Sequence, residues 1–173
     1  VWHQSGVTAQ AATMVFDRSH NLLVALDDQS EVIFAVEARN NTRQSWDQPE
    51  SWLQEKAIVP QSNAPAPNGI YAMGRALPDR PDSGVDFGSY RILIAGGMPT
   101  RREILFHSRD KRLTQEIPWN IDKNQSNSRT LGCILLQDPD LVLLANTLQQ
   151  AKKSVALVIQ GRYAKNLSSP VIP

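Results

Sequence analysis

The chain has 173 residues, and its 18 Lys and Arg against 17 Asp and Glu give a formal net charge of +1. This length suits one domain that can bury a sizeable core. The near-zero charge gives no basis for nucleic-acid binding, and no apolar run approaches the length of a membrane span. The single cysteine excludes an intramolecular disulfide.

Short apolar runs separated by Gly, Pro, Asn and Asp predict a mainly β fold. We expect a single domain over residues 14–160, preceded by a flexible lead-in (1–13) and followed by a tail (161–173). The expected strands, in chain order, are 14–17, 21–26, 31–37, 70–73, 88–94, 103–107, 134–136 and 154–159. Tight turns join the first three strands, and residues 77–84 are expected to form a surface loop.

One helix is predicted in the C-terminal half of the chain. Asp138-Pro139-Asp140 is typical of a helix start, with Asp138 as the N-cap, proline at the first helical position and a further acid in the first turn. The apolar face of this helix runs from Leu141 through Leu148.

The only cysteine, Cys133, directly precedes the apolar run Ile134–Leu136. This run is a predicted buried strand, which would give the thiol a rigid mount. Gly132 can adopt backbone conformations closed to other residues, and the N–H groups around it could point at a developing oxyanion. A nucleophilic thiol needs a nearby base at neutral pH, so the position of the histidines matters.

His107 is the histidine whose position suits that base. His3 falls in the lead-in and His20 in the turn between the first two strands, whereas His107 ends the strand 103–107. A base at the end of one strand can face a cysteine at the start of another. The alternative stays open that Cys133 is an inert buried thiol and His107 a half-buried histidine with satisfied hydrogen bonds.

A family resemblance rests on these two segments. His107-Ser108 followed by Thr130-Leu131-Gly132-Cys133 resembles the L,D-transpeptidase (YkuD-like) signature, in which a histidine precedes an [S/T]-x-G-C motif. The segment 130–136 is more similar still to the S-x-G-C-I-x-L motif of divergent relatives among the peptidoglycan-targeting effectors of type VI secretion systems. Upstream, Ala66–Tyr71 resembles the I-P-x-G-x-Y segment of those relatives, and the resemblance covers about residues 14–160.

The resemblance implies an L,D-transpeptidase-like β-sandwich or barrel with one helix and long loops. It also implies a cysteine-dependent enzyme that acts on peptidoglycan stem peptides. Cys133 would be the nucleophile, His107 the base, and the backbone carbonyl of Ser108 would fix the imidazole. Backbone N–H groups of Leu131, Gly132 and Cys133 would hold the oxyanion. Whether the enzyme is an L,D-carboxypeptidase, an L,D-transpeptidase or an exchanger of D-amino acids stays open.

Four further residues are candidates for substrate binding. The Tyr71 hydroxyl either serves at the site or caps a core aromatic residue. Arg109 belongs to a basic group around His107 that forms either a solvated rim or an attraction for stem-peptide carboxylates. Trp119 lies in a long polar loop of the kind that often binds ligands, and Thr130 opens the cysteine motif.

The resemblance also implies a location in the periplasm or outside the cell. Maintenance of the cell's own wall and an antibacterial role both stay open, and in the second case an immunity protein or secretion machinery would be the partner. One cysteine and three scattered histidines show no metal-ligand spacing, so no metal or other cofactor is expected. Two alternatives remain. A sortase also has histidine before cysteine, but it carries an arginine soon after the cysteine, and residues 134–158 contain none. The other is a non-catalytic β domain that binds cell wall or a partner protein.

Overall fold

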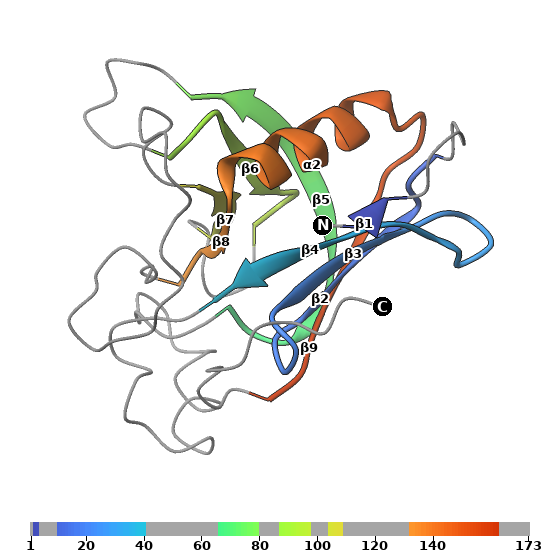
Figure 1. Cartoon of the computed structure of the whole chain (residues 1–173), viewed down its shortest axis with the longest axis horizontal. Coiled ribbons are helices and arrows are strands. Elements are labelled where there is room, and N and C mark those ends of the chain that lie inside the picture. Colours follow the sequence, from blue (N-terminus) through green and yellow to red (C-terminus); the bar gives the residue numbers. More distant parts are fainter. Residues whose placement is uncertain are drawn as a thin grey trace.

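The computed structural model describes residues 2–3, 10–40, 66–79, 87–97, 104–108 and 132–162. Within these ranges the chain forms nine strands and one helix (Figure 1). They are β1 (Trp2–His3), β2 (Thr13–Asp17), β3 (Leu22–Leu26), β4 (Val32–Arg39), β5 (Gly69–Pro78), β6 (Tyr90–Ile94), β7 (Leu105–His107), β8 (Ile134–Leu136), α2 (Asp138–Gln150) and β9 (Ala156–Gln160). No helix among the described residues is long and apolar enough to cross a membrane.

Eight of the strands close into a barrel. Their order is β4-β3-β2-β9-β5-β6-β7-β8, and β8 then pairs with β4 through Ala38↔Leu136 and Arg39↔Leu135. The neighbours β2 and β9 are parallel, as are β7 and β8, while the other pairs are antiparallel. The prediction of a mainly β sandwich or barrel with one helix is confirmed for the described residues.

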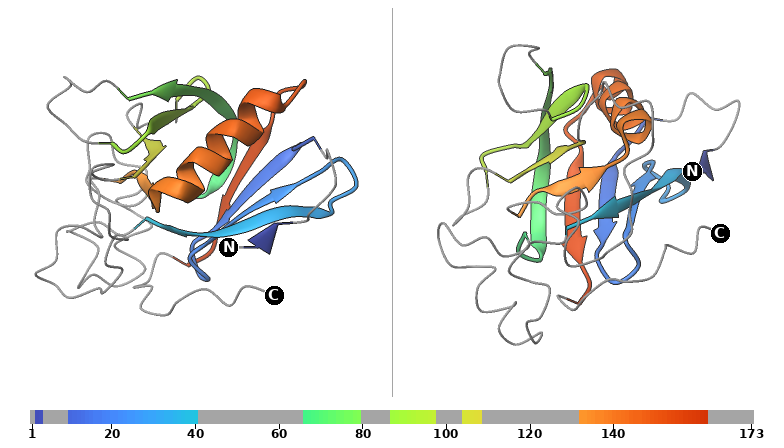
Figure 2. Two further views of the ribbon diagram at one scale, coloured as in Figure 1. Left: turned by 45° about the horizontal axis from the view of Figure 1, so that its top comes forward. Right: turned by 60° about the vertical axis from the view of Figure 1, so that its left-hand side comes forward.

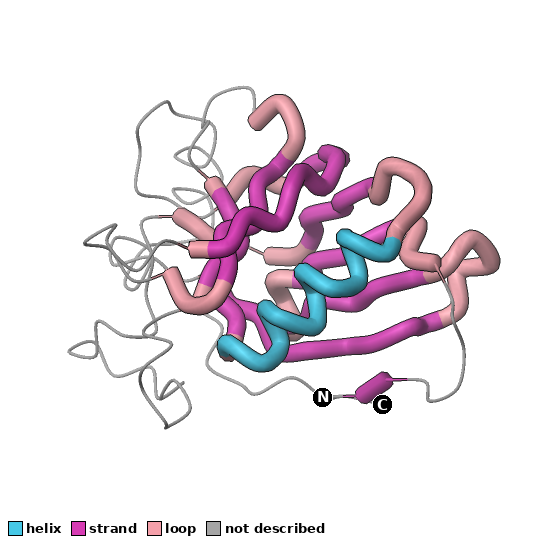
Figure 3. Tube along the Cα trace, turned by 90° about the horizontal axis from the view of Figure 1, so that it is seen from above, coloured by secondary structure: helices cyan, strands magenta, loops and turns pink. Residues whose placement is uncertain are grey.

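The helix lies in the opening between two parts of the barrel wall (Figure 2). Figure 2 shows α2 in the opening between β5–β6 and the sheet of β2, β3 and β4, and Figure 3 shows it lying over the strands. It contacts β5, β6 and β7. Its buried side chains Leu141 and Leu144 join a core cluster that includes Phe16, Phe106 and Leu157. One apolar core therefore holds the whole barrel together.

Alternating burial explains why the N-terminal strands form where the sequence predicts them. In β2 and β3 every second residue is buried, with Met14 and Phe16 on one strand facing the core beside Leu23 and Ala25 on the other. This period of two is typical of a strand with one face on the core. The turn between them contains Asn21 at φ +52, which an asparagine tolerates better than most residues.

Two expectations at the strand ends differ from the structure. Within the segment expected to be a flexible lead-in, Trp2–His3 pair with Phe34 and Ala35 of β4. Because β8 covers only Ala38 and Arg39, the first part of that edge of β4 is open to β1. The predicted loop 77–84 also begins too early, since Leu77 and Pro78 still belong to β5 and pair with Arg91 and Tyr90.

The helix begins one residue earlier than the N-cap assignment implies. Asp138 is the first helical residue and Gln137 is the N-cap, without a side-chain capping bond. The Asp138 carboxylate instead accepts hydrogen bonds from the Ser89 backbone N–H (2.7 Å) and hydroxyl (2.6 Å). This carboxylate ties the start of the helix to the residue that precedes β6.

Candidate active site

The parallel pairing of β7 and β8 brings the two predicted catalytic segments together. Phe106 pairs with Ile134 and His107 pairs with Leu135, and Cys133 lies directly before this ladder. Phe106 and Ile134 face the core cluster, whereas Leu135 is fully buried outside it. Cys133 is not part of a strand, but by the register it lies beside Leu105, two residues before the partner of His107. At standard strand spacing and rise, that offset corresponds to about 8 Å between the Cα atoms of Cys133 and His107, within reach of a cysteine and a histidine side chain.

The imidazole of His107 is held in one orientation. The ring is buried, and its Nδ1 lies 2.6 Å from the backbone carbonyl oxygen of Ser108. A carbonyl only accepts, so Nδ1 donates its hydrogen and the neutral ring carries its lone pair on Nε2. The Phe87 ring meets the imidazole edge-on at 5.1 Å between centroids. The contact expected between Ser108 and the imidazole is present, in the tautomer that a general base requires.

Ser108 is fixed by close packing on its other side. Its backbone N–H donates to the carbonyl of Phe87 (2.8 Å), and the residue is fully buried. Gly88 has φ +79, and a Cβ atom there would lie 2.6 Å from the Ser108 Cβ and 2.5 Å from an Asp138 oxygen. Only glycine fits here, both because of the positive φ and because of the close approach. The position of Ser108, which orients His107, is therefore fixed by Phe87 and Gly88, before β6.

The backbone around Cys133 is shaped by Gly132 and by the side chain of Asn40, the residue after β4. Gly132 has φ +119, a conformation that favours glycine, as the sequence analysis expects. The side-chain amide of Asn40 donates to the carbonyl oxygens of Gly132 (2.7 Å) and Cys133 (2.8 Å). Cys133 itself is half-buried. Cys133 as a residue is thus neither sealed in the core nor on an open surface.

A buried arginine supports Asn40 from behind. Arg18 is 2% exposed, and its guanidinium donates to the Asn40 side-chain oxygen (3.1 Å), to the Asn68 side-chain oxygen (2.5 Å) and to the Ala66 carbonyl. The backbone N–H of Ala66 also donates to the Asn40 oxygen (2.7 Å). These contacts join the β2–β3 turn, the end of β4 and the residues before β5 behind the cysteine.

Comparisons with known proteins bear on the fold. The sequence matches no protein-family model and no curated protein. A crystal structure of a point mutant of the helical cell shape determining protein Pgp2 from Campylobacter jejuni superposes with TM-score 0.59 at 13% identity over 94% of this chain. The fold resembles that of Pgp2. Bd1075 from Bdellovibrio bacteriovorus superposes with TM-score 0.56 at 12% identity over 91% of the chain.

The chain spans half the length of both Pgp2 and Bd1075. At such low identities the likeness is one of fold, and it agrees with the mainly β architecture described above. The roles of the site residues therefore depend on the geometry of this chain.

Three buried residues, Arg18, Asn40 and Arg39, lie in this region without any motif in the sequence that marks them. Arg39 is 2% exposed and pairs through two nitrogens with Glu37 Oε1 (2.6 and 3.1 Å). It lies opposite Leu135, which in turn lies opposite His107, so the guanidinium is on the outer face that carries the imidazole. A lone Arg or Asn at a strand end is typical of a solvated surface, and only the pairing of distant strands reveals these contacts.

Tyr71 lies in a different part of the barrel. It pairs with Leu157 of β9, its ring packs against the core cluster, and its hydroxyl donates to the carbonyl of Pro67 (2.9 Å). These contacts favour the structural alternative that the sequence left open for this residue. The other substrate-binding candidates, Arg109, Trp119 and Thr130, lie outside the described residues, as does Leu131 of the expected oxyanion-binding group.

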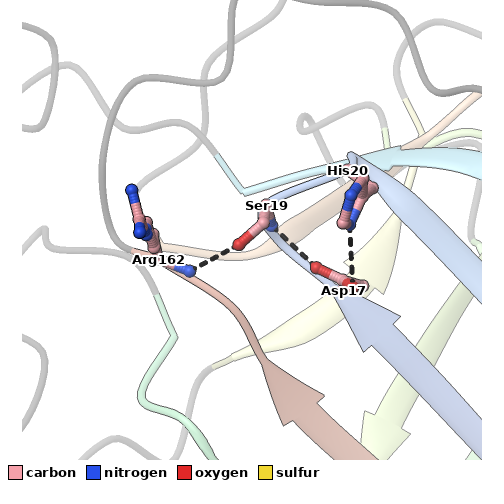
Figure 4. Close-up of polar contacts among 4 residues, drawn as sticks. All are labelled: Asp17, Ser19, His20 and Arg162. Atoms are coloured by element: carbon pink, nitrogen blue, oxygen red, sulfur yellow. Dashed lines mark hydrogen bonds and ion pairs between the residues drawn. The ribbon is translucent and has the colours of Figure 1, made fainter.

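The contacts of His20 belong to the β2–β3 turn. Its Nδ1 lies 3.0 Å from a carboxylate oxygen of Asp17, and the histidine side chain is 66% exposed (Figure 4). The Ser19 hydroxyl accepts a hydrogen bond from the backbone N–H of Arg162 (2.7 Å), and the Ser19 backbone N–H donates to Asp17 (2.9 Å). Asp, Ser and His here close the β2–β3 turn. His107 is the histidine that the described strands place beside Cys133.

Proposed function

We propose that this chain is a cysteine-dependent enzyme that removes or exchanges the terminal D-amino acid of peptidoglycan stem peptides. The observation that supports this proposal is the parallel register of β7 and β8: Cys133 directly precedes β8, and β7 ends at His107, whose Nδ1 is engaged by the Ser108 carbonyl. The motif resemblance gives the substrate class. The likeness to Pgp2, whose name describes a determinant of cell shape, supports a role at the cell wall.

In the first step, Nε2 of His107 takes the thiol proton and the sulfur of Cys133 attacks the carbonyl carbon before the terminal D-amino acid. The carbonyl oxygen becomes an oxyanion, held by backbone N–H groups of the segment 131–133. When the tetrahedral intermediate collapses, the C–N bond breaks and the imidazolium protonates the departing amine. The products of this step are a thioester on Cys133 and a free D-amino acid.

In the second step, an acceptor attacks the thioester carbon while His107 takes a proton from it. Water as the acceptor releases the shortened peptide, which is the L,D-carboxypeptidase reaction. An amine as the acceptor forms a new peptide bond, which is the transpeptidase or exchange reaction. In both cases the C–S bond breaks and the proton on His107 returns to the sulfur.

The direct test is mass spectrometry of purified tetrapeptide muropeptides incubated with the protein. We expect loss of the terminal D-alanine with the wild-type chain and none with Cys133→Ala. A matched variant, Thr147→Val, removes a hydrogen bond inside α2 and should release D-alanine at the wild-type rate. Equal release by the wild-type and Cys133→Ala proteins would exclude the mechanism. Adding a D-amino acid to the reaction separates exchange from hydrolysis.

A sortase-like transpeptidase is the second candidate. The segment after the cysteine lacks the arginine of a sortase, but Arg39 supplies a guanidinium on the face that carries His107. Arg39→Gln separates the two candidates. In a sortase-like mechanism this guanidinium assists the reacting carbonyl, so kcat should fall by more than about 100-fold. In the proposed mechanism it stands outside the chemistry, and kcat should stay within about fivefold of the wild-type value.

A non-catalytic wall-binding or partner-binding domain predicts an unreactive thiol. Alkylation of Cys133 by iodoacetamide across pH values tests this alternative, since an unassisted thiol ionises only near pH 8.5, roughly. Rapid alkylation at pH 6 to 7, roughly two units lower, would speak against a binding module. An antibacterial role in the periplasm, with an immunity protein as partner, predicts that exported wild-type protein damages a host cell and that exported Cys133→Ala does not.

A further inference from the structure

We infer that Asn40 is a positioning residue that fixes the direction of the Cys133 backbone N–H, and that Arg18 acts behind it by fixing Asn40. This inference rests on the proposed function, because it assigns that N–H to the oxyanion of the reaction. It concerns two residues that no sequence motif singles out.

The first step of the argument is the geometry of the peptide between Gly132 and Cys133. In a planar trans peptide the C=O and the following N–H point in opposite directions. The Gly132 carbonyl is directed at Asn40 Nδ2, 2.7 Å away. The N–H of Cys133 therefore points away from Asn40. A bond from the same nitrogen to the Cys133 carbonyl (2.8 Å) restrains the next peptide as well.

The second step is that the amide of Asn40 has only one orientation that suits its neighbours. Its oxygen accepts from the Ala66 N–H (2.7 Å) and from Arg18 (3.1 Å), and its nitrogen faces two carbonyl oxygens. A flipped amide would set donor against donor on one side and acceptor against acceptor on the other. Asn40 is 2% exposed, so water does not replace these bonds cheaply.

The third step concerns what Gly132 allows. At φ +119 this residue lacks the usual steric restraint on its backbone, and the peptide that follows it is intrinsically easy to rotate. A donor that stabilises an oxyanion must be aimed before the charge develops, because reorientation during the reaction costs part of the stabilisation. Asn40 supplies the restraint that the glycine lacks.

The decisive variant is Asn40→Asp. Its carboxylate keeps an acceptor for Ala66 and Arg18 but loses the donor to both carbonyls and repels them. Asn40→Ser loses the same two bonds without adding a charge. It replaces Asn40→Asp in the comparison if circular dichroism shows that Asn40→Asp is unfolded. Thr147→Val is the matched control, since it also removes a side-chain donor to a backbone carbonyl (2.8 Å, to Leu143) but within α2.

Two reactions of Cys133 are compared in each variant. Acylation by p-nitrophenyl acetate passes through a tetrahedral oxyanion, whereas alkylation by iodoacetamide displaces iodide and forms none. For Asn40→Asp we expect the acylation rate to fall about 100-fold, with alkylation within about threefold of wild type. For Thr147→Val both rates should stay within about twofold of wild type, because that bond lies away from the site.

Three results would contradict a proposal, and they are distinguishable. Equal acylation of folded Asn40→Asp and wild-type protein overturns this inference and leaves the proposed function standing. A parallel loss of acylation and alkylation shows that Asn40 only holds the fold, and it also overturns the inference. A wild-type protein that is alkylated but never acylated contradicts the proposed function itself.

Discussion

The backbone carbonyl of Ser108 does for the imidazole of His107 what a carboxylate does in many hydrolases: it accepts the Nδ1 hydrogen and sets the tautomer. A carbonyl carries no net charge, so it orients the ring but attracts the imidazolium less strongly than a carboxylate would. The side chain of residue 108 is not needed for this role. The buried Ser108 hydroxyl indeed has no hydrogen-bond partner among the residues that the structure describes.

Replacing His107 by alanine removes the proposed base. We expect kcat for D-amino-acid release to fall by about 100-fold or more. Alkylation of Cys133 should then follow the titration of an ordinary thiol, with its midpoint near pH 8.5, roughly. Measuring both on the same protein separates a lost base from a lost fold. An unchanged alkylation profile would remove His107 from the mechanism.

Gly88→Ala should disturb the site without touching either reacting residue. The new Cβ would lie 2.5 Å from Asp138 Oδ1 and 2.6 Å from Ser108 Cβ. Gly96→Ala is the control, because Gly96 has a similar φ of +71 and nothing within 4 Å of its Cβ position. We expect urea unfolding to show a loss of about 1–2 kcal/mol for Gly96→Ala and roughly 2 kcal/mol more for Gly88→Ala. Equal losses of unfolding free energy in the two variants would mean that Asp138 and Ser108 move away from the new Cβ atom at no cost.

At the scale of single residues, the sequence predicted the site residues that stand out by their type and position. A single cysteine after a glycine, and a histidine at the end of an apolar run, are visible without a structure. Arg18, Arg39 and Asn40 are not, because nothing in their spacing separates a buried arginine from a solvated one. Arg18 and Asn40 are bonded to partners far along the chain, such as Asn68 and Gly132, and Arg39 lies opposite Leu135 of a distant strand.

Among the elements, the start of α2 is hydrogen-bonded to the residue before β6 through the Asp138 carboxylate. Asp138 accepts two hydrogen bonds from Ser89, one from its backbone and one from its hydroxyl. We expect Asp138→Ala to lower the free energy of unfolding by about 1.5–3 kcal/mol, since both bonds are lost. Ser89→Ala keeps the backbone bond and should cost only about 1 kcal/mol. Equal costs in urea unfolding would show that the hydroxyl bond carries the whole effect.

Strand positions were predictable because burial alternates, but the way the strands close was not. The parallel pair of β2 and β9 joins residues about 140 positions apart, such as Thr13 and Ala156. The closure of β4 on β8 depends on only two residue pairs. Hydrophobic periodicity reports on the neighbours of a residue along the chain, and it carries no information on such distant pairings. The short β1 was missed for the same reason.

The molecule as a whole is organised around one core that both halves of the barrel share. Leu157 of β9 is fully buried and lies between Met14 of β2 and Tyr71 of β5, while the next residue, Val158, is half-buried on the other face. We expect Leu157→Ala to lower the free energy of unfolding by about 2–5 kcal/mol and Val158→Ala by about 1 kcal/mol. Near- and far-ultraviolet circular dichroism should give coincident transitions in both variants. Separate transitions would divide the barrel into independent halves.

Because β7 and β8 run in the same direction, the end of β7 and the start of β8 lie at opposite ends of the pair, and the sequence between Ser108 and Gly132 links them. Neither reacting group belongs to that linking segment. Natural variation can therefore lengthen, shorten or replace it while the sulfur and the imidazole keep their mutual position. We therefore expect relatives that differ in substrate preference to differ most in the sequence between these two strands.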